Sequence, residues 1–213
     1  MQLHRGPVPE SPDFQPLDQG WSGIREPGPI LVQLLALPIG VVVLALLSLP
    51  VLLVAPELLA VDRADLPLVP LVIVLVVCIP VHELIHAFSH PGLGMTDETY
   101  IGIWPAKGVF YAHHGGAMSR NRFLWVFCTP VFVLSLLPLG IVLLFHPFLP
   151  QSVLICLAAL SAFNGVAASG DILGVILIAT QVPWAATVRN QGWKTFWRLD
   201  TPGRTRGSAP TKE

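Results

Sequence analysis

Residues 66–90 have the sequence LPLVPLVIVLVVCIPVHELIHAFSH, which contains no Asp, Glu, Lys or Arg from Leu66 to His82. A helix that crosses a lipid bilayer needs about 20 predominantly apolar residues. This segment is long enough for one such helix, and its first charged residue, Glu83, comes only near its end. We therefore predict a transmembrane helix with a group of polar residues close to one end.

Two other long segments lack Asp, Glu, Lys and Arg, namely 27–56 and 123–170. The first is long enough for one membrane-spanning helix and the second for two, with a turn around 146–150. The sequence therefore predicts a polytopic membrane protein with four transmembrane helices, at about 30–54, 66–90, 123–146 and 152–181.

The composition of the whole chain agrees with this class. Of its 213 residues 53% are hydrophobic and 12% are charged, and the mean hydropathy is +0.68. A soluble domain carries about 25% charged residues, so we expect the lipid bilayer to be the main partner. The net charge of −1 gives no indication of nucleic-acid binding.

Positive charges predict the orientation, because short cytoplasmic loops are enriched in Lys and Arg. Three cations lie in the loop 91–122 and six in the tail after Val182, against one in the loop 55–65 and none at 147–151. We predict an integral, multi-pass protein of the cell membrane with both termini in the cytoplasm. Three tryptophans are expected to lie at the membrane interface: Trp184, Trp193 and Trp197.

The predicted domain organisation follows the helices. Residues 1–28 form a cytoplasmic N-terminal segment, 29–182 the helical domain, and 183–213 an interfacial tail that is disordered from Thr201 onward. Between the second and third helices, alternating residues at 100–104 and 109–111 flank a Pro/Gly-containing turn and predict a small β-hairpin, with a simple interfacial loop as the alternative. The fold class is thus all-α with one hairpin.

His82, Glu83 and His86 form an HExxH sequence. Residues four apart on a helix project from the same face, so both imidazoles can reach one metal ion. Zinc lowers the pKa of water toward 7, and Glu83 is placed to act as the general base. Ionisable groups inside a bilayer usually mark a function; the alternative is that the helix ends at Val81 and these residues are solvated.

A catalytic zinc site needs a third protein ligand. His90 lies about 12 Å along the helix from His82, and at most one of His113 and His114 could face the metal, because adjacent strand residues point in opposite directions. The remaining candidate is Asp171, whose predicted depth in the membrane matches that of the two histidines. Alternatively, Asp171 is paired with a buried amide or protonated.

Asn164 lies two helical turns before Asp171 and could donate a hydrogen bond to a substrate oxyanion or join neighbouring helices. The three cysteines, Cys78, Cys128 and Cys156, lack metal-type spacing and lie inside predicted helices, which predicts no disulfide framework. We expect Cys78 to be a small buried residue and not a ligand.

The chain resembles a family of membrane proteins described as "putative zincin peptidases", distantly similar to the site-2 intramembrane metalloproteases. The specific part of the resemblance is HELIHA at 82–87 together with Asn164 and the sequence Ser-Gly-Asp at 169–171. It implies a zinc metallopeptidase with zinc ligands His82, His86 and Asp171 and with Glu83 as the catalytic acid/base. The site-2 proteases place a glycine after their distal aspartate, whereas here Gly170 precedes Asp171 and Ile172 follows it.

Three functions are compatible with these residues. The first is an intramembrane zinc metalloprotease that cleaves a membrane protein or peptide near the cytoplasmic face. The second is a metal-binding membrane protein without peptidase activity, such as a transporter or sensor, and the third is a scaffold whose HExxH is accidental. Two imidazoles and a carboxylate suit zinc, although iron(II) accepts the same set. The sequence indicates neither the substrate nor the oligomeric state.

Overall fold

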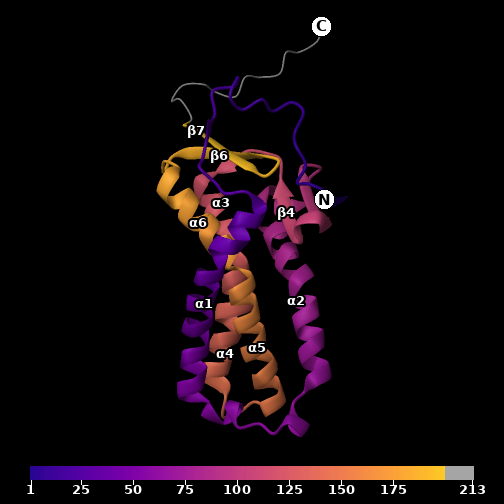
Figure 1. The fold of residues 1–213 in the computed structure, drawn as a ribbon, viewed down its shortest axis with the longest axis vertical. Helices are drawn as coiled ribbons and strands as arrows, with labels where there is room; N and C mark the ends of the chain where they lie inside the picture. Colours follow the sequence, from indigo (N-terminus) through magenta and orange to yellow (C-terminus); the bar gives the residue numbers. More distant parts are fainter. Residues whose placement is uncertain (200–213) are drawn as a thin grey trace.

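The computed structural model describes residues 1–199, which form an elongated helical bundle with two small sheets at one end (Figure 1). Its helices are α1 (Pro29–Val54), α2 (Leu68–Ser89), α3 (Arg120–Val131), a π-helix (Phe132–Leu136), α4 (Leu137–Phe145), α5 (Gln151–Ala167) and α6 (Ser169–Gln181). The predicted disorder from Thr201 onward concerns residues outside this described part.

Three helices are long and apolar enough to cross a membrane: α1, α2 and the continuous helix Arg120–Phe145. They coincide closely with the predicted segments 30–54, 66–90 and 123–146. Large apolar side chains such as Val41 in α1 and Val76 in α2 are exposed on the outside of the bundle. Such a surface would be costly in water and fits a membrane protein.

The prediction of one continuous helix at 152–181 is wrong. This segment is broken at Ala168 into α5 and α6, which meet at a bend of 46°. The backbone of Ala168 leaves helical geometry (φ −75°, ψ 3°). A glycine near the break allows close packing, because a Cβ on Gly165 would collide with the Leu47 side chain of α1. Together α5 and α6 pass the same test for a membrane span as one bent pair.

The all-α class is incomplete, because two sheets cover one end of the bundle. One has the strand order β1–β3–β4 (Gln2–Arg5, Thr99–Trp104, Val109–His114), and the other has the order β2–β7–β6–β5 (Ser22–Gly23, Lys194–Leu199, Ala186–Gln191, Met118–Ser119). Strands β3 and β4 pair antiparallel and contain the predicted strand segments 100–104 and 109–111. The hairpin β6–β7 and the two N-terminal strands are additional.

Two apolar clusters hold the bundle together. The first packs α3 and α6 beneath β6 through Met118, Phe123, Val126, Ile178, Val182, Ala186 and Val188. The second lies among α1, α4 and α5 and consists of Leu47, Val51, Leu139, Val142 and Leu154. The first cluster matters for function, because it fixes α6 against the sheet end of α3.

The N-terminal segment is bound to the β6–β7 hairpin just before α1 begins. The Glu26 carboxylate accepts hydrogen bonds from the backbone N–H and the hydroxyl of Thr195, and Trp193 Nε1 donates to the Pro27 carbonyl over 3.0 Å. Burial raises the pKa of Glu26 above its ordinary value, although the Thr195 hydrogen bonds and Lys194 act in the opposite direction. The N-terminal and C-terminal segments therefore form one layer over the sheet end of the bundle.

Replacing Glu26 with alanine should destabilise this layer by about 1–3 kcal/mol, because two buried donors of Thr195 would lose their acceptor. Glu26→Gln keeps an acceptor and serves as the matched control.

The stabilising contribution of Glu26 should also depend on pH. Because the folded-state pKa of Glu26 is raised, this contribution is complete below the unfolded-state pKa of about 4.3 and decreases as pH rises through the folded-state pKa. Thermal unfolding in detergent should show that the melting temperature of the wild type falls relative to that of Glu26→Gln as pH rises from the unfolded-state to the folded-state pKa. A melting-temperature difference that does not change with pH would contradict the prediction.

Candidate metal centre

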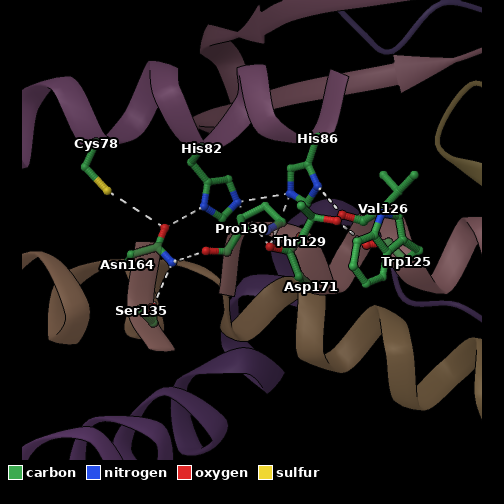
Figure 2. Close-up of polar contacts among 10 residues, drawn as sticks. All are labelled: Cys78, His82, His86, Trp125, Val126, Thr129, Pro130, Ser135, Asn164 and Asp171. Carbon is green, nitrogen blue, oxygen red and sulfur yellow. Dashed lines mark hydrogen bonds and ion pairs between the residues drawn. The ribbon is translucent and has the colours of Figure 1, made fainter. Parts of the chain in front are cut away.

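Two helices bring the candidate metal-binding side chains together. His82 and His86 lie one turn apart near the C-terminal end of α2, and Asp171 lies in the first turn of α6. Figure 2 shows both imidazoles pointing from α2 toward the Asp171 carboxylate. Because α6 begins immediately after the break at Ala168, Asp171 is carried on the short helix that the bend turns away from the axis of α5.

The three ligand atoms form a compact triangle. His82 Nε2 lies 3.0 Å from His86 Nε2, and Asp171 Oδ2 lies 3.1 Å from the first and 3.3 Å from the second. A tetrahedral zinc ion with bonds of about 2.0–2.2 Å separates its ligand atoms by about 3.3–3.6 Å, slightly more than these distances. Within the described residues, this is the group of three that could hold a metal ion, and its dimensions fit zinc.

The tautomers of both histidines support a cation at this position. His82 Nδ1 lies 2.8 Å from Asn164 Oδ1, and His86 Nδ1 lies 2.8 Å from the Val126 carbonyl oxygen. Both partners accept hydrogen bonds, so each Nδ1 carries the proton and each Nε2 presents a lone pair. Asp171 Oδ2 is buried without a hydrogen-bond partner among the described residues. Three lone pairs therefore converge, an arrangement that a metal ion would satisfy.

Asn164 is fully buried behind His82, and its hydrogen bonds favour the second of its two predicted roles, joining neighbouring helices. Its amide nitrogen donates to the Pro130 carbonyl over 3.1 Å and to Ser135 Oγ over 2.9 Å, which leaves its oxygen facing His82. Both N–H groups are thus occupied (Figure 2). Ser135 belongs to the π-helix between α3 and α4, a type of insertion that occurs frequently at functional sites. Asn164 joins helices and orients His82.

Replacing Asn164 with alanine should weaken zinc binding by about 10–100-fold, the usual cost of removing an outer-shell partner of a ligating histidine. His82 would lose the group that fixes its tautomer and ring orientation. Competition with a chromophoric chelator measures the affinity directly. Ser161→Ala is the control, because Ser161 is buried one turn away on α5 and its hydroxyl has no hydrogen-bond partner among the described residues. Equal affinities in the two variants would contradict this role.

Glu83 lies beside the metal-binding residues on the wall of a cavity of about 500 Å³. The cavity is bounded by α1, α2, α6 and strand β4, and its apolar lining includes Val32, Ile79, Phe110 and Leu173. The backbone N–H of Ala112 in β4 is directed at the Glu83 carboxylate. A carboxylate, a metal-binding triad and an apolar cavity therefore meet at one place.

The end of α2 is held by a side chain from α3. Arg122 Nε donates to the Ser89 carbonyl over 2.6 Å, and its terminal nitrogen donates to the His90 carbonyl over 3.0 Å. A cation that binds the last carbonyls of a helix satisfies them and interacts favourably with the helix dipole. This contact fixes the turn that carries His86, and the sequence alone did not identify it.

The other candidate ligands, namely His90, His113 and His114, lie outside the group of residues whose ligand atoms meet at the triad. Burial is the main reason that the pKa values of His90 and His113 are lowered, to about 3 and about 4, and neighbouring histidines contribute in the same direction. Both imidazoles are therefore neutral. Cys78 is buried and lies 3.8 Å from Asn164 Oδ1, as expected for a packing residue. All three cysteines are free.

Comparison with known proteins gives one family. A family model, DUF3267, described as "Putative zincin peptidase", matches residues 75–187, which is more than half of the chain and includes His82, Glu83, His86 and Asp171. Neither the curated proteins nor the solved structures include a match. The similarity to site-2 proteases stays a prediction. The chain belongs to the family described as "putative zincin peptidases", which agrees with a zinc-binding metallopeptidase.

Proposed function

We propose that this protein is an intramembrane zinc metalloprotease that hydrolyses a peptide bond of a membrane protein near the cytoplasmic face. The observation that carries the proposal is the convergence of His82 Nε2, His86 Nε2 and Asp171 Oδ2 beside Glu83 in a cavity between apolar helices. The family match supports the peptidase class.

His82, His86 and Asp171 would hold a zinc ion, which would supply the Lewis acidity that activates a water molecule and polarises the scissile carbonyl. Glu83 accepts the proton from the attacking water and transfers it to the leaving amine as the carbon–nitrogen bond breaks. Asn164 keeps His82 in the tautomer that presents Nε2 to the metal.

Strand β4 supports the binding of an extended substrate. It is the terminal strand of its sheet, and the Gly115 N–H bonds to the Glu98 carbonyl just before β3. In an antiparallel pair, successive residues direct their N–H and C=O groups alternately toward and away from the partner strand. Since Gly115 bonds toward β3, the main-chain groups of Ala112, three residues earlier, point away from β3 and toward Glu83. A peptide added to this open edge would lie in the cavity, with its main chain fixed by hydrogen bonds.

The membrane position is supported by the exposed apolar faces of α1 and α2 and by the distribution of Lys and Arg. The two sheets and α3 lie toward one end of the bundle (Figure 1), and the triad residues lie near the C-terminal end of α2 and in the first turn of α6. The cations of the loop 91–122 and of the tail favour the cytoplasmic face for this end.

Mass spectrometry of peptide termini in cell membranes tests the proposal without requiring an identified substrate. Cells that express the wild type should contain new termini within or next to transmembrane segments, and cells that express Glu83→Gln at the same level should lack them. Identical sets of termini in the two strains would rule out the proposed protease function.

A further inference from the structure

Gly170 lies on the wall of the cavity, directly before the metal-binding Asp171 in the first turn of α6. A Cβ added at this position would meet no heavy atom within 4 Å, apart from its chain neighbours and the backbone of its own helix. The space in front of Gly170 is therefore free. The proposed mechanism gives this position no role.

Neither the backbone nor the packing of α6 requires a glycine at position 170. The φ angle of Gly170 is not positive, and alanine is more favourable than glycine in a regular helix. Gly174, one turn later, is different, because a Cβ there would lie 2.9 Å from the Phe127 ring. What the glycine at position 170 provides is free volume beside the metal centre.

The residues of α6 that line the cavity show where this free volume lies. Successive residues of an α-helix are rotated by about 100°, so the direction of residue 170 falls between those of Asp171 and Leu173. Both of these residues line the cavity, as do Gly174 and Leu177 one and two turns farther along. A side chain at position 170 would thus point into the cavity, on the same wall as the Asp171 carboxylate.

The neighbouring walls of the cavity suit an apolar side chain of a ligand. They include Phe163 of α5, Leu173 of α6 and Ile79 of α2, the last of which lies one turn before Glu83. The cavity volume of about 500 Å³ is typical of sites that enclose a ligand of drug size. An extended peptide directs successive side chains to opposite sides, so a peptide bound in the cavity would direct one of them toward α6.

We propose that the space in front of Gly170 is a specificity subsite for a large apolar side chain of the substrate, next to the scissile peptide bond. This inference rests on the proposed protease function and specifies its substrate class: a peptide segment with a residue such as leucine beside the bond that is cleaved. The missing side chain at position 170 sets the size of the subsite. Burial of the substrate side chain there favours binding and holds the adjacent carbonyl in place beside the metal centre.

Binding of two hydroxamates to the zinc-loaded, full-length protein tests the subsite without requiring cleavage. N-acetyl-leucine hydroxamate and N-acetyl-glycine hydroxamate share the zinc-binding group and differ only in the side chain. Calorimetry in detergent should show that the wild type binds the leucine compound at least about 10-fold more tightly than the glycine compound. Gly170→Val should bind the leucine compound about 10–200-fold more weakly than the wild type and the glycine compound equally well. Gly170→Ala, which adds one methyl group and favours the helix, should show a smaller loss.

Gly140→Val is the matched control. Gly140 lies in α4, has free space at its Cβ position and no positive φ, and is not among the residues that line the cavity. This variant should bind both compounds as the wild type does. A wild type without preference for the leucine compound, or Gly170 variants that keep the wild-type preference, would overturn the subsite.

Two further measurements separate the subsite from the metal centre and from the protease function. Both Gly170 variants should retain the zinc content of the wild type, and loss of zinc in them would overturn the subsite by making Gly170 part of the metal centre. The hydroxamate result does not depend on cleavage. If the compounds bind as predicted but Glu83→Gln leaves the peptide termini in cell membranes unchanged, the subsite stands and only the protease function fails.

Discussion

Replacing Glu83 with glutamine should lower the rate of peptide hydrolysis by about 10²–10⁴-fold, the usual contribution of a general acid–base group, and leave the bound zinc unchanged. Glutamine has nearly the same shape but cannot accept a proton from the attacking water. The rate is measured with purified protein in liposomes and a substrate identified from its peptide termini. Zinc content is measured on the same samples.

Glu57→Gln is the matched control, because Glu57 lies in a short 3-10 turn after α1 and is exposed. It should cleave at the wild-type rate. If Glu83→Gln cleaves as fast as the wild type, Glu83 is not the general base. Metal uptake into liposomes that survives this change, with no cleavage by either protein, would instead favour the transporter or sensor function.

Asp171→Ala should abolish the stabilisation of the protein by zinc. In the wild type, zinc at 100 times its dissociation constant stabilises the folded state by about 2.7 kcal/mol, so a chelator should lower the melting temperature. The variant lacks the ligand from α6, and the same chelator should leave its melting temperature unchanged. Thermal unfolding with and without the chelator measures the difference.

The variant should remain folded without zinc. In the metal-free wild type, Asp171 Oδ2 lies 3.1 Å from His82 Nε2 and 3.3 Å from His86 Nε2, so a protonated histidine can pair with it. The variant loses this pair, but both histidines keep their Nδ1 hydrogen bonds to Asn164 and to the Val126 carbonyl. Asp62→Ala, in the loop before α2, should behave as the wild type. A chelator response in Asp171→Ala equal to that of the wild type would contradict its role as a ligand.

Hydropathy predicted the three helices that are long and apolar enough to cross a membrane, because length and apolar composition decide whether a segment can span a bilayer. The same logic identified Asp171, since a single carboxylate in a long uncharged segment needs a partner. The helical spacing of His82 and His86 predicted that both would point the same way. The structure brings these three residues together from two helices.

The helix break and the orientation of Asn164 could not be predicted, because they depend on contacts between residues far apart in the sequence. The break at Ala168 lies in a segment that, with α5 and α6 taken together, is apolar enough for one membrane span. The amide nitrogen of Asn164 donates the two hydrogen bonds that turn its oxygen toward His82, and their acceptors, Pro130 and Ser135, lie about 30 positions earlier in the chain.

The missed strands had a weaker signal. Strand β6 alternates in burial over its first residues, and the turn to β7 is at Gly192, which has a φ of 56°. This hairpin pattern was obscured by the interleaved cations and tryptophans that resemble an interfacial tail. Strands β1 and β2 are short and are formed by pairing with β3 and β7, so the local sequence contributes little to them.

The central claim is that one zinc ion is held jointly by α2 and α6. Elemental analysis of detergent-purified protein, prepared without chelators, tests it most directly when the wild type is compared with His86→Ala and Asp171→Ala. We predict that each variant contains one zinc ion per chain fewer than the wild type. A wild type without zinc, or variants with undiminished zinc, would contradict the account.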